Sequence, residues 1–111
     1  MMKFRIAAAS TLLAATTLVH AAETPAQLDQ KNCKVEYPKA SLMNEEQGEV
    51  GMSFLVNPDG SVADSKIEKS SGFKTLDKAT VKMIGACKFK PGTKDGAPAQ
   101  TWTKVEYVWK L

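Results

Sequence analysis

The stretch from Gly48 to Lys69, GEVGMSFLVNPDGSVADSKIEK, decides the fold of this chain. Its first part has apolar residues at every second position, as in a half-buried β-strand: Val50, Met52, Phe54 and Val56. Asn57-Pro58-Asp59-Gly60 is a strong turn signal, because proline fixes φ and glycine accepts a positive φ. The chain returns as a second strand, in which Val62 and Ile67 have opposite parity and indicate a bulge or a twist. This stretch predicts a β-hairpin.

A short helix is expected before the hairpin. Pro38 suits the first position of a helix, where its missing N–H costs nothing. Residues 39–46 then form the helix, with Ala40, Leu42 and Met43 as candidate buried positions.

A longer helix and a third strand are expected after the hairpin. From about Lys74, apolar residues recur at spacings of three and four and form one stripe: Leu76, Ala79, Met83, Ile84 and Cys87. Residues 100–111 are strand-like, with Trp102 and Val108 on one face and the remaining apolar residues on the other: Val105, Tyr107, Trp109 and Leu111. The order predicts an α+β fold, in which one helix packs on a face of a three-stranded antiparallel sheet.

The first 21 residues have the features of a secretory signal peptide. Lys3 and Arg5 precede an apolar run over residues 6–19, and Val19-His20-Ala21 fits the small-x-small cleavage pattern. We expect cleavage near Ala21 and release into the periplasm. The alternative is an inner-membrane anchor, but as a helix this run spans only ~21 Å, against a hydrocarbon core of ~30 Å. After cleavage, residues 22–36 are expected to be a flexible lead-in and residues 37–111 the folded domain.

Cys33 and Cys87 are the two cysteines of the chain. Export to an oxidising compartment favours a disulfide between them. The spacing of reactive thiol pairs, Cys-x-x-Cys, is absent. We therefore expect these cysteines to stabilise the fold.

Charge and composition exclude most kinds of chemistry for the exported chain. Loss of Lys3 and Arg5 leaves thirteen basic residues, all lysine, against twelve acidic residues, so nucleic acid is not an expected partner. Loss of His20 leaves no histidine for a catalytic relay or a metal site. No phosphate-binding loop or paired catalytic carboxylates are evident. We expect no enzyme activity, no cofactor, no metal and no small-molecule substrate.

The surface of the sheet remains as a candidate site. The edge of a three-stranded sheet carries unpaired N–H and C=O groups, and natural modules use such an edge to bind an extended peptide. The last strand is the better edge, because it is long and rich in aromatic residues. Trp102, Tyr107 and Trp109 are candidate anchors there, although core packing is the competing interpretation for each.

The chain resembles the C-terminal domain of TonB-type energy transducers over residues 37–111. The resemblance rests on motifs in this order: Tyr37-Pro38-x-Ala40, Gly48-Glu49-Val50, Phe54-x-Val56-x-x-Asp59-Gly60-x-Val62, Ser70-Ser71-Gly72-x-x-x-Leu76-Asp77-x-Ala79, Phe89-x-Pro91, Gly96-x-Pro98 and Val105-x-Tyr107-x-Trp109-x-Leu111. It implies an α+β fold and binding of a short peptide from outer-membrane receptors along the last strand, with Tyr37-Pro38 close to the receptor. The partner-binding residues are then expected to be Tyr37, Pro38, Gln100, Trp102, Lys104, Glu106 and Val108.

The resemblance implies a periplasmic module linked to TonB-dependent transport. We expect no counterpart of the long Pro-rich spacer and membrane anchor of complete transducers, so the module would bind a receptor without pulling it. Two alternatives are a short transducer anchored in the inner membrane, and an envelope assembly factor that does not bind receptors. A homodimer formed by strand exchange would hide the same edge.

Overall fold

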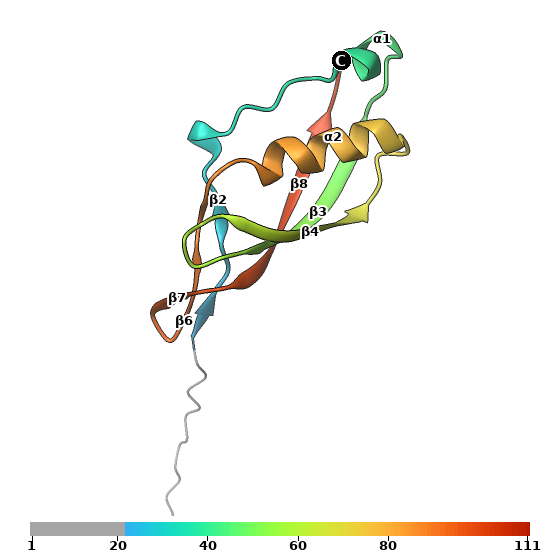
Figure 1. The fold of residues 1–111 in the computed structure, drawn as a ribbon. Helices are drawn as coiled ribbons and strands as arrows, with labels where there is room; N and C mark the ends of the chain where they lie inside the picture. The colour runs from blue at the N-terminus through green and yellow to red at the C-terminus, as the bar shows by residue number, and fades with distance from the viewer. Residues whose placement is uncertain (1–21) are drawn as a thin grey trace, which may run out of the picture.

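A computed structural model describes residues 22–111, so the predicted signal peptide lies outside the described residues. Two helices and one short 3-10 helix alternate with eight strands along this part of the chain (Figure 1). The helices are η1 (Gln30–Asn32), α1 (Lys39–Met43) and α2 (Lys74–Gly85). The strands are β1 (Glu23–Thr24), β2 (Gln27–Leu28), β3 (Gly48–Val56), β4 (Val62–Lys69), β5 (Phe89–Lys90), β6 (Gly92–Lys94), β7 (Ala97–Ala99) and β8 (Thr101–Trp109).

The main sheet has the strand order β4-β3-β8, and both of its strand pairs are antiparallel. The central strand β3 pairs with β8 without interruption, from Gly48 opposite Trp109 to Val56 opposite Thr101. The β3–β4 pair contains two register shifts, and one of them falls between Asp64 and Val62. That shift accounts for the opposite parity of Val62 and Ile67. Since α2 lies across one face of this sheet, the predicted fold class is confirmed (Figure 1).

The core lies between the sheet and α2. The alternating apolar residues of β3 are at most 1% exposed, and they pack with Leu76 and Ile84 of α2, both 0% exposed. Burying a side chain of this size stabilises a fold by ~1.5–3 kcal/mol. The residues of this period-2 pattern therefore form the centre of the core.

The buried stripe of α2 differs from the predicted one. Leu76 and Ile84 are buried as expected, whereas Ala79 and Met83 are only half-buried. Asp77 and Thr80 are buried instead. Polar side chains can occupy these positions because hydrogen bonds satisfy them: Asp77 accepts from Ser70 and Ser71, and Thr80 donates to the Leu76 carbonyl oxygen at 2.6 Å.

The lead-in is more regular than the sequence indicated. Its two short strands pair antiparallel with strands that follow α2, β1 with β6 and β2 with β5. Ala26 is 2% exposed and belongs to the core cluster. We call residues 22–36 the strap. Its strands have only two residues each, too short for a periodic pattern to be visible in the sequence.

The prediction for α1 was wrong about burial. Ala40 is exposed, and Leu42 and Met43 are 47% and 81% exposed, whereas Ser41 is fully buried. Helix α1 has five residues and lies at one end of the domain, beside the C-terminus (Figure 1). It is not part of the layer that covers the sheet, so its apolar side chains do not pack on the face of the sheet. No helix among residues 22–111 is long and apolar enough to cross a bilayer.

Candidate functional site

Strand β8 forms one edge of the main sheet. It pairs with β3 along its whole length, and within residues 22–111 no strand pairs with its other side. The eight rises of ~3.3 Å between its nine residues give an edge of about 26 Å from Thr101 to Trp109. Such an edge presents a row of N–H and C=O groups with the geometry of a half-completed ladder.

The two faces of β8 differ in exposure. Its odd-numbered residues face α2 and are buried or half-buried: Thr101, Thr103, Val105, Tyr107 and Trp109. Its even-numbered residues lie on the opposite, exposed face: Trp102, Lys104, Glu106 and Val108. Trp102 is 43% exposed and Val108 is 54% exposed. The division of this strand into two faces therefore follows the predicted alternation.

Charges on the exposed face alternate along β8. Lys104 and Glu106 are separated by one residue, and neither forms a salt bridge with another described side chain. Lys66 of β4 lies over the Trp102 ring, with its Nζ 4.6 Å from the ring centroid. Further along the sheet, Lys69 donates to Glu49 at 2.8 Å, and this hydrogen bond raises the pKa of Lys69.

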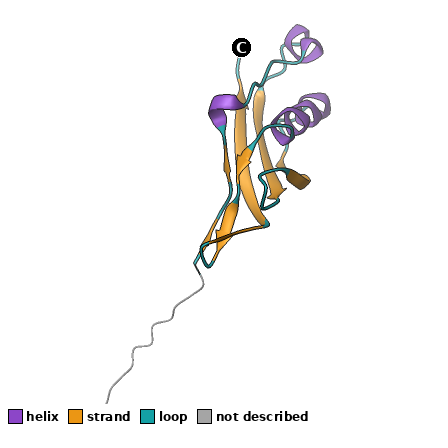
Figure 2. Cartoon of the chain, turned by 60° about the vertical axis from the view of Figure 1, so that its left-hand side comes forward, coloured by secondary structure: helices purple, strands orange, loops and turns teal. Residues whose placement is uncertain are grey.

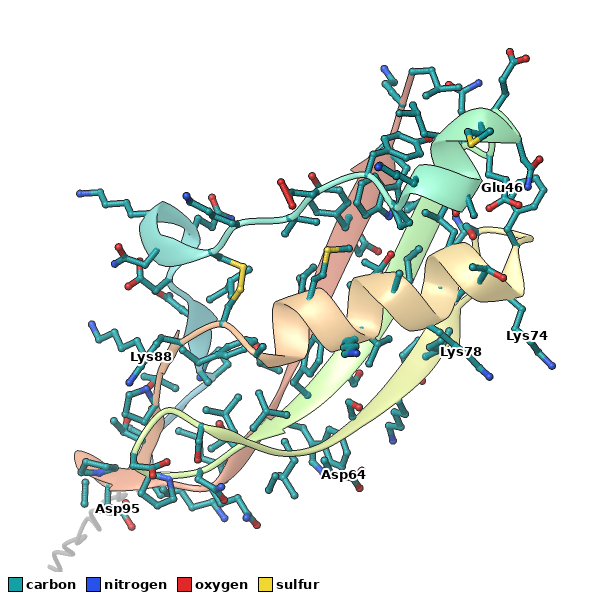
Figure 3. The ribbon with its side chains drawn as sticks, turned by 45° about the horizontal axis from the view of Figure 1, so that its top comes forward. Glu46, Asp64, Lys74, Lys78, Lys88 and Asp95 are labelled. Carbon is teal, nitrogen blue, oxygen red and sulfur yellow. A yellow bond between two sulfur atoms is a disulfide. The ribbon has the colours of Figure 1, made fainter. Side chains whose placement is uncertain are left out.

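The strap lies along the same edge as β8 (Figures 1 and 2). The Thr103 hydroxyl donates to the Ala26 carbonyl oxygen at 2.8 Å. No backbone hydrogen bond joins the strap to β8 in the described part of the chain. The strap is held elsewhere, by the Cys33–Cys87 disulfide and by the Asp29 amide, which donates to the Lys88 carbonyl oxygen at 3.0 Å. Figure 3 shows this disulfide connecting the strap to the segment that follows α2.

Three hollows follow one another between the strap and β8, and we call them together the edge groove. Their volumes are about 370, 490 and 340 Å³. The first is beside residues 100–102, the second beside residues 103–106 and the third beside residues 105–107. The third is lined by Leu28, Cys33, Val35, Ile84, Val105 and Tyr107, together with Gln30 and Glu106, and its surface is about equally polar and apolar.

An aromatic cluster closes the far end of β8. The Trp109 ring lies 4.7 Å from the ring of Tyr37 and 4.7 Å from that of Tyr107, measured between centroids. The Tyr37 hydroxyl donates to the Glu46 carbonyl oxygen. Desolvation, together with the Glu46 carboxylate, raises the pKa of Tyr37. Trp109, which is 3% exposed, thus packs within the domain, the interpretation that competed with partner contact for this residue.

The seven predicted partner-binding residues do not form one continuous surface. The four even-numbered residues of β8 share one face, and Gln100 precedes them with its side-chain amide donating to Asn57 at 2.8 Å. Tyr37 packs instead on Trp109, which faces α2, and Pro38 caps the start of α1. No sequence pattern predicted that strap residues would line the groove. Their only signal was the apolar pair Ala26 and Leu28 at alternate positions.

The described residues offer no arrangement of metal ligands. Within residues 22–111, no three histidine, cysteine, aspartate or glutamate side chains lie close enough together to hold an ion. Both cysteines are joined in the disulfide. The buried carboxylate of Asp77 accepts hydrogen bonds from the turn at residues 70–71 and so holds the start of α2.

Comparison with curated proteins finds relatives for most of the domain. The chain is 54% identical over 75 residues to a protein TonB of Neisseria meningitidis serogroup C, and 32% identical over 72 residues to a protein TonB of Haemophilus influenzae. The matched parts are 68% and 65% of this chain, but 24% and 27% of those proteins. The chain therefore spans about a quarter of the length of these relatives.

Solved structures and a family model agree with this comparison. The solution structure of the Pseudomonas aeruginosa TonB C-terminal domain has a TM-score of 0.59 at 18% identity, covering 80% of this chain and 86% of that domain. A Helicobacter pylori TonB C-terminal domain has a TM-score of 0.53 at 30% identity, covering 74% of this chain and 71% of that one. The family model described as Gram-negative bacterial TonB protein C-terminal matches residues 34–111. The chain belongs to this family.

Proposed function

We propose that this domain binds an extended peptide by strand addition to the edge of β8, as a binding module and not as an enzyme. The observation that carries the proposal is that one side of a nine-residue edge strand has no partner strand within residues 22–111. The strap lies close to that edge without backbone hydrogen bonds to it, so the donors and acceptors of β8 are available to a fourth strand. In a ladder of this kind, backbone hydrogen bonds supply affinity and side chains supply specificity.

Side chains on the exposed face of β8 add contact area for such a peptide. Trp102 and Val108 are large, apolar and about half exposed. The ammonium group of Lys66, on β4, lies over the Trp102 ring and restrains it by a cation–π interaction. A restrained aromatic ring loses little conformational entropy on binding, which makes it an efficient anchor.

We propose as the partner a short peptide of a TonB-dependent outer-membrane receptor, and TonB-dependent transport as the process. Membership in the TonB C-terminal family supports this choice. Gln100 lies at the start of the binding strand. At its other end Tyr37 packs on Trp109 and Pro38 precedes α1, and there both would contact the receptor outside the peptide.

An NMR titration tests the proposal. Isotope-labelled protein is titrated with synthetic N-terminal peptides of outer-membrane receptors, and saturable shifts are expected along residues 100–111. Trp102→Ser should weaken binding roughly tenfold, as for an interface anchor. Ile67→Ser is the matched control, because Ile67 is 41% exposed on β4, at the opposite edge. Absence of shifts at millimolar peptide would contradict receptor binding and favour the role in envelope assembly.

We further propose that residues 1–21 are removed on export and that the domain acts in the periplasm. The support is the sequence pattern that ends at Ala21. Mass spectrometry of the natively exported protein should find Ala22 at the N-terminus, and osmotic shock should release the protein. An intact Met1 in the membrane fraction would instead support the anchored transducer.

A further inference from the structure

We infer that the edge groove selects its peptide by a three-residue pattern, one apolar residue between two residues of opposite charge. The inference rests on the proposed function and names the chemistry of its partner. The apolar residue occupies the third hollow of the groove. The two charged residues pair with Lys104 and Glu106.

The apolar position follows from the alternation of side chains in a sheet. Residues that are opposite each other on neighbouring strands point to the same face. Val105 and Tyr107 point towards α2, so peptide side chains opposite them also enter the space on that side of β8. This space is the hollow of about 340 Å³ whose far wall is formed by Leu28 and Val35 of the strap.

The chemistry of this hollow favours an apolar side chain. Val105, Tyr107 and Ile84 line one side, and Leu28, Val35 and Cys33 line the other. Glu106, the charged residue of the lining, belongs to the exposed face of β8 by its parity. A leucine-sized group would cover the apolar part of this surface, which a serine side chain is too small to cover.

The charge pattern follows from the other face of the same strand. Lys104 and Glu106 flank Val105, are exposed, and form no salt bridge within residues 22–111. A peptide residue opposite Val105 therefore has neighbours that lie opposite Lys104 and Glu106. Opposite charges across a strand pair attract, and like charges repel. The best peptide has an acidic residue opposite Lys104 and a basic residue opposite Glu106.

Two synthetic peptides of the same composition test the charge pattern. They differ only in their three central residues, Asp-Leu-Lys in one and Lys-Leu-Asp in the other. Both orders are needed, because the order that matches depends on whether the added strand runs parallel or antiparallel to β8. At low salt, the exported protein should bind one of them roughly fivefold more tightly. The double variant Lys104→Glu/Glu106→Lys should invert this preference, and added salt should diminish it.

A second pair of measurements tests the hollow. Replacing leucine by serine in the preferred peptide should weaken binding roughly tenfold. Val35→Thr keeps the shape of the wall but replaces a methyl group by a hydroxyl. It should therefore reduce the ratio of the affinity for the leucine peptide to the affinity for the serine peptide. Ile67→Thr, which introduces a hydroxyl on β4 at the opposite edge of the sheet, should leave the ratio unchanged.

The possible failures are distinguishable. If neither peptide order binds, the proposed strand addition fails and the inference fails with it. If both orders bind equally, or the double variant keeps the original preference, the charge pattern is wrong while strand addition stands. If leucine and serine bind equally, the hollow does not select the apolar residue.

Discussion

The Trp109 indole N–H donates to the hydroxyl oxygen of Thr80 at 2.8 Å, and both residues are buried. The Thr80 hydroxyl in turn donates to the Leu76 carbonyl oxygen at 2.6 Å. This chain of two hydrogen bonds joins the end of β8 to the middle of α2, so one helix residue helps to position the strand that carries the candidate site.

Thr80→Val should therefore destabilise the domain. Valine has nearly the same shape but cannot accept a hydrogen bond, so the Trp109 N–H would remain buried without a partner. The expected loss is ~1–3 kcal/mol of unfolding free energy, measured by urea denaturation. Thr75→Val is the matched control, because Thr75 is exposed on the same helix. Equal losses in the two variants would mean that the hydrogen bond contributes little.

Opening the Cys33–Cys87 disulfide should also destabilise the domain. The two cysteines are 54 positions apart, and a loop of that length gives ~4 kcal/mol in the chain-entropy treatment. Reductant should lower the melting temperature markedly, and the amide shifts of the main sheet should persist below it. Cys33→Ser/Cys87→Ser is expected to melt like the reduced protein and to be insensitive to reductant. Equal melting of the oxidised and reduced proteins would contradict a stabilising role.

Asp77 should make stability depend on acid pH. Its burial by itself would raise its pKa, but hydrogen bonds from Ser70 and Ser71 outweigh burial and hold the pKa below the ordinary value of 3.8. The folded state thus binds this proton less readily than the unfolded state. The resulting stabilisation is fully present above about pH 4 and is lost as the pH falls through the lower, folded-state pKa.

Asp77→Asn tests this dependence. The variant should lose ~1.5–3 kcal/mol near neutral pH, because the amide offers a donor where the carboxylate oxygen accepted hydrogen bonds. It should also show a smaller decrease between pH 5 and pH 2 in urea denaturation. Hydrogen bonds from Ser61 lower the pKa of Asp59 as well, but Asp59 is exposed. The acid dependence of Asp59→Asn is therefore compared with that of Asp77→Asn. A steeper acid dependence in Asp77→Asn than in the wild type would contradict the assignment.

Substituting Gly60 and Gly72 by alanine distinguishes two costs of adding a side chain: backbone strain at positive φ and a steric clash. Both have positive φ, +90° and +99°, so alanine at either position should cost ~1–2 kcal/mol. A Cβ at Gly60 would also lie 2.4 Å from the Phe89 carbonyl oxygen, whereas nothing lies within 4 Å at Gly72. Gly60→Ala should therefore lower the melting temperature more than Gly72→Ala. Similar melting of the two variants would show that the turn shifts to relieve the contact.

Local patterns were sufficient to predict the main sheet and its helix. The alternation in β3, the turn at residues 57–60 and the helical spacing after Lys74 each depend on residues close together in sequence. They failed for α1, because its apolar residues lie at the end of the domain where no layer covers them. They also failed for Asp77 and Thr80, whose burial depends on hydrogen-bond partners contributed by other elements.

The sequence by itself determined the fold class and the two faces of β8, because alternation and turn chemistry are local properties of the chain, and the order of its motifs carried the resemblance to the family. Only the tertiary structure decided that the strap lies along the edge of β8 and encloses a groove with it. That arrangement depends on contacts between distant residues, such as the Thr103 hydroxyl with the Ala26 carbonyl oxygen and the pairing of β1 with β6. No local pattern encodes such contacts, because they form only when the whole domain packs.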